Sequence, residues 1–497
     1  MSAPHGRISV LVGIDLGSTR TKVGLITTDG VPIGFARAEH TTDVDPSTGR
    51  AEQDPEAWWT GLRLATREAV VRGERVGELD VLGVCVAGHV PTLTVVDGAG
   101  LPVRKAMTWL DSRAVTEQAE LERATGLRGW ALGVLPAALW LERHEPATAA
   151  RTSWYLNSWE ALALRLSGRA ATTVVPGGAA VPAVAAASIG LDPSRIAPEA
   201  GTGTILGGLL PEAATQLGLP VGTPVVAGLV DAFASFHGAR MLAAGDAIDV
   251  GGTAGGFGVY SVRETQVAGG FTTPAPLAGM FSVGGAMAAT GAALDWFARE
   301  VLGGAVPTAE LIDEAARIPP GADGLVFLPY LAGERSPLWD PHARGAFIGI
   351  TLRHTRAHMT RAILEAAALA IRHVAEPMLR AGIEVSAMRV CGGPARSDLW
   401  NQVKADVTGF PVEVPRARET AAVGAAIVAA VGVGAHPDLP SAIRSMTAID
   451  RRFEPRADTK ATYDRAFAAY VALYPAIAPV LRLLEAERTA VPTGVPV

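Results

Sequence analysis

The sequence contains little cysteine, few aromatic residues and no long run of basic residues. Its two cysteines, Cys85 and Cys391, stand far apart in apolar segments of a chain of 497 residues. A secreted fold held by disulfides needs more cysteines, so we expect a protein of the reducing cytoplasm. Cys85 lies four residues before His89, but two ligands make no metal site, and a small buried side chain is the better interpretation. The net charge of −6 argues against a nucleic-acid partner.

No segment is interpreted as a signal peptide or a membrane span. The first seven residues do not form a cationic region followed by a long apolar segment. The longest weakly polar runs that we identify, residues 177–190 and 421–435, are shorter than the ~18–20 residues that cross a bilayer. We therefore expect no membrane partner, and we interpret residues 421–435 as a helix of small residues packed against a sheet.

A repeated motif indicates how the chain is organised. Residues 14–19 read Ile-Asp-Leu-Gly-Ser-Thr, and residues 248–253 read Ile-Asp-Val-Gly-Gly-Thr. A second apolar stretch follows each copy, so each predicts a strand, a tight turn and another strand, which is a β-hairpin. The chain is also too long for one ordinary core. We expect two domains built on one plan, residues 1–243 and 244–497, with the break near residues 242–247.

Between these motifs, apolar strands alternate with amphipathic helices, which is the pattern of an α/β protein. Asp54 is a predicted N-cap, and Pro55 fits the first turn of the helix that follows it. The expected strands are 81–86, 225–227 and 388–391, and the expected helices are 54–71, 231–241, 358–379 and 398–408.

The two hairpin turns and their aspartates indicate phosphate chemistry. Glycine lets the backbone approach phosphate oxygens, and Ser or Thr hydroxyls donate hydrogen bonds to them. Asp15, at the mouth of the first turn, suits Mg²⁺ held through water, because Mg²⁺ gives up its waters reluctantly. Asp249 is its counterpart in the second copy, where it lies near the metal or only fixes the turn. Asp231 follows a strand and a glycine and opens a helix, so on spacing alone it is an N-cap residue.

The sequence around these motifs resembles a known family. Residues 13–19 are similar to the first phosphate motif of the superfamily that contains sugar kinases, Hsp70 and actin. Within it the chain resembles the FGGY carbohydrate kinases, which include xylulose, ribulose, gluconate and glycerol kinases. The resemblance runs from about residue 9 to about residue 433. The segments that carry it are Gln53-Asp54-Pro55 with Trp58-Trp59, and residues 109–113, 227–232, 328–337, 340–350, 358–365, 392–397 and 405–409.

This resemblance implies an α/β fold of two actin-like (ribonuclease H-like) domains with a central catalytic cleft. It implies a cytoplasmic enzyme, compatible with a homodimer, that uses ATP and Mg²⁺ to phosphorylate a small sugar or polyol, for example a ketopentose such as xylulose. Two other functions are open: an ATPase similar to actin or Hsp70, and a sugar-binding regulator without kinase turnover. Against them stand the absence of a peptide-binding extension or filament insertion, and the retention of Asp15, Thr19, Asp231 and Thr253.

The resemblance also assigns roles to single residues. Asp231 becomes the general base that accepts the proton of the attacking sugar hydroxyl, and Asp15 is assigned to the metal. The nucleotide is expected to contact Gly17, Ser18, Thr19, Lys22, Gly252, Thr253, Gly291, Asp295, Gly392, Gly393 and Ser397. The sugar is expected to contact His89, Val90, Trp109, Asp111 and Asp231. Gly291 could equally serve only helix packing, and Trp109 only the core.

The sugar half of the sequence departs from the family pattern. Xylulose kinases are similar to one another in a run Ser-Gly-Gln-Met-His-Gly. Residues 87–92 here read Ala-Gly-His-Val-Pro-Thr, so His89 replaces Gln and Pro91 replaces His. Ala137 stands where the family usually has a lysine, and residues 155–160 and 172–177 lack the usual Lys-Asp and Asp-x-Ser pairs. The residues for ATP are conventional and those for the sugar are not, so the sequence leaves the sugar open.

Overall fold

The computed structural model describes residues 7–490 except 46, 128, 176–186, 188 and 253. The chain forms two compact units. Unit 1 consists of Met1–Leu242, Pro274–Gly279 and Glu419–Ala448, and unit 2 of Ala243–Thr273, Met280–Arg418 and Ile449–Val497. The first crossing between the units falls after Leu242. The chain later returns to unit 1 with Glu419–Ala448, so the units are not two continuous halves of the chain.

A mixed sheet forms the centre of unit 1. Its strands lie in the order β12 (Ile205–Gly208), β13 (Pro224–Val230), β6 (Leu79–Gly88), β1 (Ile8–Leu16), β2 (Arg20–Thr27) and β3 (Pro32–Glu39). β1, β6 and β13 are parallel, whereas β1 and β2 form the predicted antiparallel hairpin. The parallel trio is buried on both faces, which explains its runs of Val, Leu and Ile.

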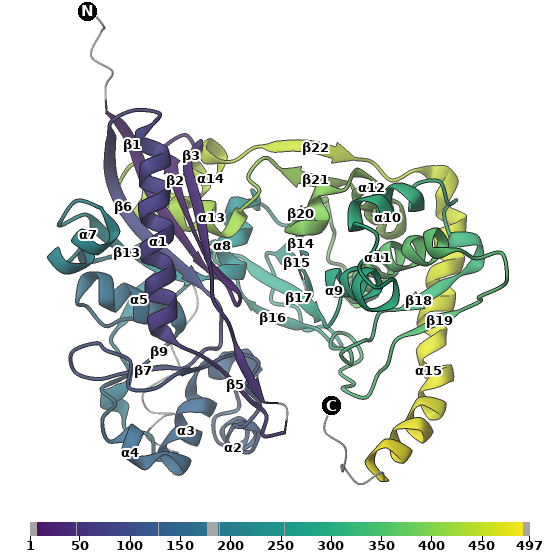
Figure 1. Cartoon of the computed structure of the whole chain (residues 1–497), viewed down its shortest axis with the longest axis horizontal. Helices are drawn as coiled ribbons and strands as arrows, with labels where there is room; N and C mark the ends of the chain where they lie inside the picture. Colours follow the sequence, from purple (N-terminus) through teal and green to yellow (C-terminus); the bar gives the residue numbers. More distant parts are fainter. Residues whose placement is uncertain are drawn as a thin grey trace, which may run out of the picture. The chain divides into compact units, whose positions relative to one another are not determined.

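Helices cover both faces of this sheet. α1 (Pro55–Glu74), α5 (Ser158–Ser167) and α7 (Pro211–Leu217) share a core with the strands on one face. α8 (Asp231–Gly238) and α13 (Thr420–Gly432) pack together on the other, and Figure 1 shows α1 in front of the strands and α13 behind them. α1 begins as predicted: Asp54 accepts a hydrogen bond of 3.0 Å from the backbone N–H of Glu56, and Pro55 is the first helical residue.

The return of the chain to unit 1 follows from the composition of α13. This helix consists almost wholly of Ala, Val, Ile and Gly and is buried on all sides, which is typical of a helix enclosed by other elements. Its neighbours lie very close. A Cβ on Gly13 of β1 would lie 1.9 Å from the carbonyl oxygen of Ala422. Only glycine allows the helix to approach the strand so closely, so the packing of α13 on β1 requires Gly13.

Unit 1 contains a smaller region in addition to its main sheet. It contains a sheet in the order β4 (Asp43–Asp45), β5 (Arg50–Gln53) and β8 (Ala106–Met107), and a second pair, β7 (Thr94–Val96) and β9 (Trp154–Leu156). α2 (Val115–Thr125) and α3 (Leu135–His144) pack beside these strands around a core that includes Leu121, Leu139 and Tyr155.

Unit 2 repeats the plan with different additions. Its main sheet has the order β16 (Phe271–Pro274), β17 (Phe281–Met287), β15 (Gly255–Ser261), β14 (Asp246–Val250), β20 (Ala387–Cys391), β21 (Val412–Pro415) and β22 (Ile449–Phe453). β14 and β15 form the second predicted hairpin, and β14 is parallel to β20. The repeated motif therefore forms the same local structure in each unit.

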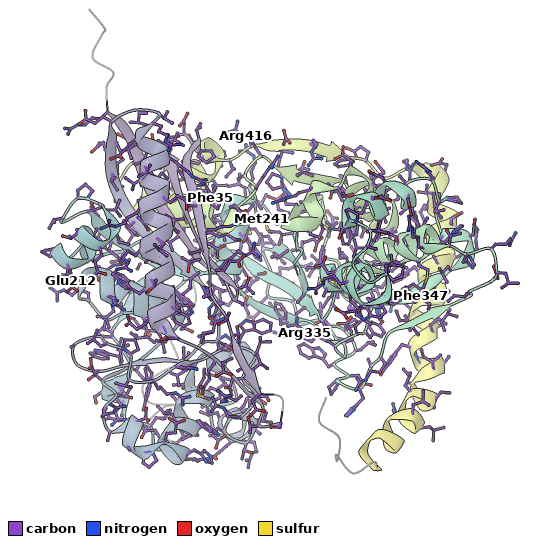
Figure 2. All side chains as sticks on the ribbon, viewed as in Figure 1. Phe35, Glu212, Met241, Arg335, Phe347 and Arg416 are labelled. Atoms are coloured by element: carbon purple, nitrogen blue, oxygen red, sulfur yellow. The ribbon has the colours of Figure 1, made fainter. Side chains whose placement is uncertain are left out.

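The helices of unit 2 include α9 (Gly291–Trp296), α11 (Arg356–Arg380), α12 (Asp398–Thr408) and α15 (Lys460–Ala490). Phe347, on β19 (Ala346–Ile348) and labelled in Figure 2, stacks on Phe327 of β18 (Val326–Leu328) with 4.3 Å between ring centres. This stack adds to a core formed with α9 and α11. The expected helices and strands named above are confirmed, with ends that differ by a few residues.

α15 contains an apolar stretch that the sequence analysis did not identify. Ala457–Leu484, which covers most of this helix and the turn before it, contains an 18-residue window with a mean hydropathy of 1.6 and is, by length and composition alone, able to cross a membrane. Tyr463 and Tyr470 of this helix are nevertheless buried in the core of unit 2. Because 17% of the apolar window is buried, the helix packs on unit 2 along one side only.

Candidate functional site

Strand pairing in unit 1 brings three predicted site residues to one edge of the sheet. Leu16, the last residue of β1, lies opposite Gly88 of β6, and Gly88 lies opposite Val230 of β13. The residues that follow these strands therefore leave the sheet side by side. They are Gly17, His89 and Asp231. The carboxyl edge of parallel strands is where α/β proteins bind ligands.

Asp15 belongs to a cluster of charges at this edge. Its Oδ2 lies 3.1 Å from Nζ of Lys22, which lies 3.0 Å from Oε2 of Glu419. Burial raises the pKa of Asp15, and Lys22 only partly offsets this effect. Burial favours the neutral form of Lys22, but the charges of Asp15 and Glu419 outweigh it and raise its pKa. The cluster thus holds one ammonium between two carboxylates.

Asp231 is the first residue of α8, with Val230 as the N-cap, so it lies one residue inside the helix compared with the N-cap position expected from spacing. Its Oδ1 accepts a hydrogen bond of 2.7 Å from the N–H of Ala232. Burial and the neighbouring charge of Asp15 raise the pKa of Asp231 to about 7. A carboxylate with a pKa near neutral pH has the proton affinity that suits a general base.

The first hairpin turn is held by side chains from distant segments. Nε1 of Trp109 donates a hydrogen bond of 2.9 Å to Oγ of Ser18. Nε2 of Gln53 donates one of 2.5 Å to the carbonyl oxygen of Ser18, and Nε2 of His40 lies 2.9 Å from that of Gly17. The side chain of Thr19 remains exposed at the turn. Trp109 therefore acts on the turn itself, a contact that neither interpretation from the sequence included.

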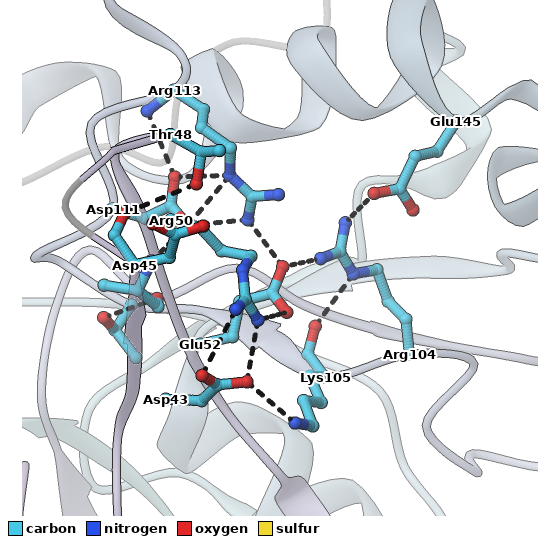
Figure 3. Close-up of polar contacts among 12 residues, drawn as sticks. Asp43, Asp45, Thr48, Arg50, Glu52, Arg104, Lys105, Asp111, Arg113 and Glu145 are labelled. Carbon is cyan, nitrogen blue, oxygen red and sulfur yellow. Dashed lines mark hydrogen bonds and ion pairs between the residues drawn. The ribbon is translucent and has the colours of Figure 1, made fainter. Parts of the chain in front are cut away.

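An ion network holds the segment that carries Trp109 (Figure 3). Glu52 of β5 binds Arg104 and Arg113, and its side chain is 8% exposed. Asp111 is 2% exposed; its Oδ2 lies 2.6 Å from Nη2 of Arg113 and accepts a hydrogen bond of 2.9 Å from the N–H of Ala51. Both oxygens of Asp111 thus serve the loop within unit 1. Sequence reasoning did not identify Glu52 or Arg104, because their partners in this network lie 41 to 61 residues away.

His89 offers a free polar atom at the same edge. Its side chain is buried and packs edge-on against Trp58, with 5.6 Å between ring centres. Nδ1 lies 2.7 Å from Oγ1 of Thr92, whereas Nε2 has no hydrogen-bond partner among the described residues. Burial lowers the pKa of His89 to about 3, so the ring is neutral. An unsatisfied buried nitrogen is costly unless a ligand completes it. Val90 beside it is half-buried.

Unit 2 presents the second group of predicted nucleotide residues. Val250 of β14 lies opposite Cys391 of β20, so Gly251 and Gly392 leave the sheet together. The N–H of Gly291 donates a hydrogen bond of 3.0 Å to the carbonyl oxygen of Gly252. A Cβ on Gly393 would meet no atom within 4 Å, so its backbone is open to a ligand.

The other residues of unit 2 that were predicted to contact the nucleotide or the metal differ in their surroundings. Oγ of Ser397 accepts a hydrogen bond of 3.2 Å from the N–H of Trp400, so Ser397 is the N-cap of α12. Asp295 is exposed on α9. Thr253 lies outside the described residues. Asp249 pairs with Lys404, which leaves it engaged within unit 2.

The residues present fit Mg²⁺ bound mainly through water and phosphate. Among the described residues, no group of three or more His, Cys, Asp or Glu side chains is arranged to hold a metal ion. Asp15 is a single carboxylate beside the glycine turn that carries the exposed side chain of Thr19. Mg²⁺ is usually held by one or two carboxylates together with substrate phosphates. Such a site needs no dedicated cage of side chains.

Comparison with known proteins identifies the family. Residues 10–179 match the N-terminal domain, and residues 249–433 the C-terminal domain, of the FGGY family of carbohydrate kinases. A xylulose kinase from Staphylococcus epidermidis is 28% identical, covering 94% of this chain and 96% of that protein. A glycerol kinase from Thermus brockianus is 31% identical over 90% and 94% of the two chains.

Solved structures agree with this comparison. The crystal structure of xylulose kinase from Rhodospirillum rubrum is 31% identical, covers 95% of this chain and 100% of its own, and superposes with a TM-score of 0.81. A gluconate kinase structure from Lactobacillus acidophilus, 20% identical, shares the fold with a TM-score of 0.84. The predicted family, its α/β fold in two domains, and its sugar kinase activity with ATP and Mg²⁺ are confirmed: the chain belongs to the FGGY family of carbohydrate kinases.

Proposed function

We propose that this carbohydrate kinase phosphorylates a hydroxyl of a small ketose, with xylulose or a close relative as the substrate and Asp231 as the general base. The observation that carries the proposal is the position of Asp231. It stands at the carboxyl edge of the sheet, at the start of α8, beside the glycine turn of the first hairpin. Several similar curated proteins are xylulose kinases, which supports the choice of sugar.

The chemistry required of Asp231 is the removal of one proton. Its ionised carboxylate accepts the proton of the attacking hydroxyl, which leaves that oxygen more nucleophilic. Burial and Asp15 keep the carboxylate basic enough for this task near neutral pH. The neutral ring of His89 supplies Nε2 as a hydrogen-bonding group at the same edge, suited to orient a sugar hydroxyl.

The nucleotide is assigned to the glycine turns. We assign the phosphates to Gly17 and Ser18 in unit 1 and to Gly252 in unit 2. We assign the adenosine to Gly393, where a Cβ would meet no atom within 4 Å. Bound Mg-ATP supplies the phosphoryl group and a cation that neutralises its charge. Lys22 adds a positive charge near the turn of unit 1, and we propose Asp15 as the residue that holds the hydrated metal.

The test is a panel of pentuloses, hexuloses, sugar acids and polyols, with ADP release coupled to formation of the sugar phosphate. We expect a ketose to give the largest kcat/KM, and Asp231→Asn to abolish phosphate transfer while Mg-ATP still binds. Near-normal turnover by Asp231→Asn would refute the assignment of the base. ATP hydrolysis that no sugar accelerates would favour the ATPase alternative, and sugar binding without transfer would favour the regulator. The cytoplasmic location and a homodimer stay predictions.

A further inference from the structure

Unit 2 holds a lysine and an aspartate that are both withdrawn from solvent. Nζ of Lys404, on α12, lies 2.5 Å from Oδ2 of Asp249, on β14, and the two side chains are 2% and 3% exposed. The same Nζ lies 5.5 Å from the centre of the Trp400 ring. Removing two charges from water costs several kcal/mol for each ion, and an apolar pair of similar volume is often at least as stable. A contribution to stability alone therefore does not explain why unit 2 contains this buried ion pair.

The pair lies beneath the two loops assigned to the nucleotide. Asp249 precedes Gly251 by two residues at the end of β14, and Lys404 is in the middle of the helix that begins after Ser397. β14 and β20 are parallel neighbours, so the loops after these strands begin side by side. The ion pair thus connects the strand before the phosphate loop to the helix after the adenosine loop.

The backbones of these two loops lie in close contact. Gly392 has a φ of 79°, and a Cβ there would lie 1.8 Å from the carbonyl oxygen of Gly251. Below them is a small cavity whose lining includes Gly251, Thr290, Pro394 and both members of the ion pair. Its volume of about 10 Å³ holds about one water molecule. The ring of Pro394 lies beside Gly251 and would come within 3.2 Å of a Cβ there, so the relative position of the loops depends on this contact and on the elements below.

We propose that Asp249 and Lys404 are positioning residues that hold the second phosphate loop in register with the adenosine loop and thereby set the affinity for ATP. This inference rests on the proposed function, in which ATP contacts both loops. Because the carboxylate of Asp249 is engaged by Lys404, it acts on the loop and not on a metal. Loss of the ammonium leaves a buried carboxylate without its partner, and the end of β14 shifts as that carboxylate turns toward water.

The experiment compares Lys404→Met with the double variant Asp249→Asn/Lys404→Met. We expect Lys404→Met to raise both the KM for ATP and the Kd for Mg-ATP about tenfold, while the KM for the sugar stays within about twofold. The double variant no longer contains the unpaired charge, so its Tm returns toward that of the wild type. Its KM for ATP stays raised about fivefold, because the link between the loops is still absent.

Arg456→Met is the matched control, because it removes the partner of a buried aspartate on the same helix, Asp406. Nη2 of Arg456 lies 2.6 Å from Oδ2 of Asp406, whose side chain is fully buried, and this pair joins α12 to the segment after β22. We expect it to lower the Tm and to leave the KM for ATP within about twofold. An unchanged KM for ATP in both Lys404 variants, or an equal rise in Arg456→Met, overturns the positioning role.

Calorimetric titration of Mg-ATP without sugar separates this inference from the function beneath it. If the wild type binds no Mg-ATP, the nucleotide assignment fails and the positioning role fails with it. If the wild type and the two Lys404 variants bind Mg-ATP equally, only the positioning role is overturned. Weaker binding by both Lys404 variants, with normal binding by Arg456→Met, supports it.

Discussion

Replacing Asp231 by Asn changes how the stability of the protein depends on pH. In the folded wild type the pKa of Asp231 is raised from 3.8 to about 7 by burial and by Asp15. Between these two values the folded state binds a proton that the unfolded state releases. Wild-type stability therefore falls as the pH rises through that range. The asparagine side chain has no such proton, so this part of the pH dependence disappears in the variant.

The magnitude follows from the two pKa values. At pH 5 the proton held by folded Asp231 contributes about 2.5 kcal/mol to the free energy of unfolding, and at pH 8 its contribution is close to zero. From pH 5 to pH 8 the variant should therefore gain about 2.5 kcal/mol relative to the wild type. For a domain of this size that corresponds to roughly 5–10 °C in Tm. The proposed base is thus expected to contribute less to stability at the pH where it works than at acidic pH.

The assay is thermal unfolding of both proteins at pH 5, 6, 7 and 8, in EDTA and without nucleotide, so that no metal shifts the carboxylate. Glu199→Gln removes an exposed carboxylate of the same unit and controls for the loss of one charge. We expect the Tm of Asp231→Asn minus that of the wild type to increase with pH, and that of Glu199→Gln to stay level. A difference for Asp231→Asn that is constant with pH would refute the raised pKa and the argument for a poised base.

Three other substitutions test the remaining parts of the site in unit 1. His89→Ala should change the ratio of kcat/KM between two ketoses about threefold to tenfold, the value of one neutral hydrogen bond, and an unchanged ratio removes His89 from the sugar site. Trp109→Phe loses the hydrogen bond to Ser18 and should raise the KM for ATP about fivefold; an unchanged KM shows that the turn needs no such support. Glu52→Gln removes a carboxylate from two arginines whose side chains are 12% exposed and should lower the free energy of unfolding by about 3 kcal/mol, measured by urea denaturation. A shift below the experimental error would show that this network contributes little to stability.

The parts of the site that lie close in sequence were predictable. A strand, a glycine turn and an aspartate fix the local geometry at Asp15 and Asp231, and parallel pairing then brings the strand ends together. The pairing of Asp111 with Arg113, two residues apart, is equally local. Local patterns therefore predicted which residues gather at the sheet edge, although not how each side chain is engaged.

The contacts that the sequence does not reveal join residues hundreds of positions apart. Glu419 reaches Lys22 only because α13 returns to unit 1, and nothing in a uniformly apolar helix indicates which sheet it covers. The apolar stretch in α15 was missed for a related reason. Pro475 and Pro479 interrupt it in sequence, yet both lie inside the helix. Both positions are exposed, and a missing backbone N–H is tolerated better at an exposed position than at a buried one.

The two aspartates of the repeated motif lie in the same local structure, and we propose a different role for each. Asp15 and Asp249 occupy equivalent hairpins, and each has a lysine partner. Asp15 shares Lys22 with Glu419, and its charge is felt by Asp231, so carboxylates outnumber the ammonium and a divalent cation is favoured there. Asp249 has Lys404 to itself in the interior of unit 2, where a further cation would be repelled. We therefore attribute the two proposed roles, metal residue and positioning residue, to the surrounding charges, because the motif is the same in both units.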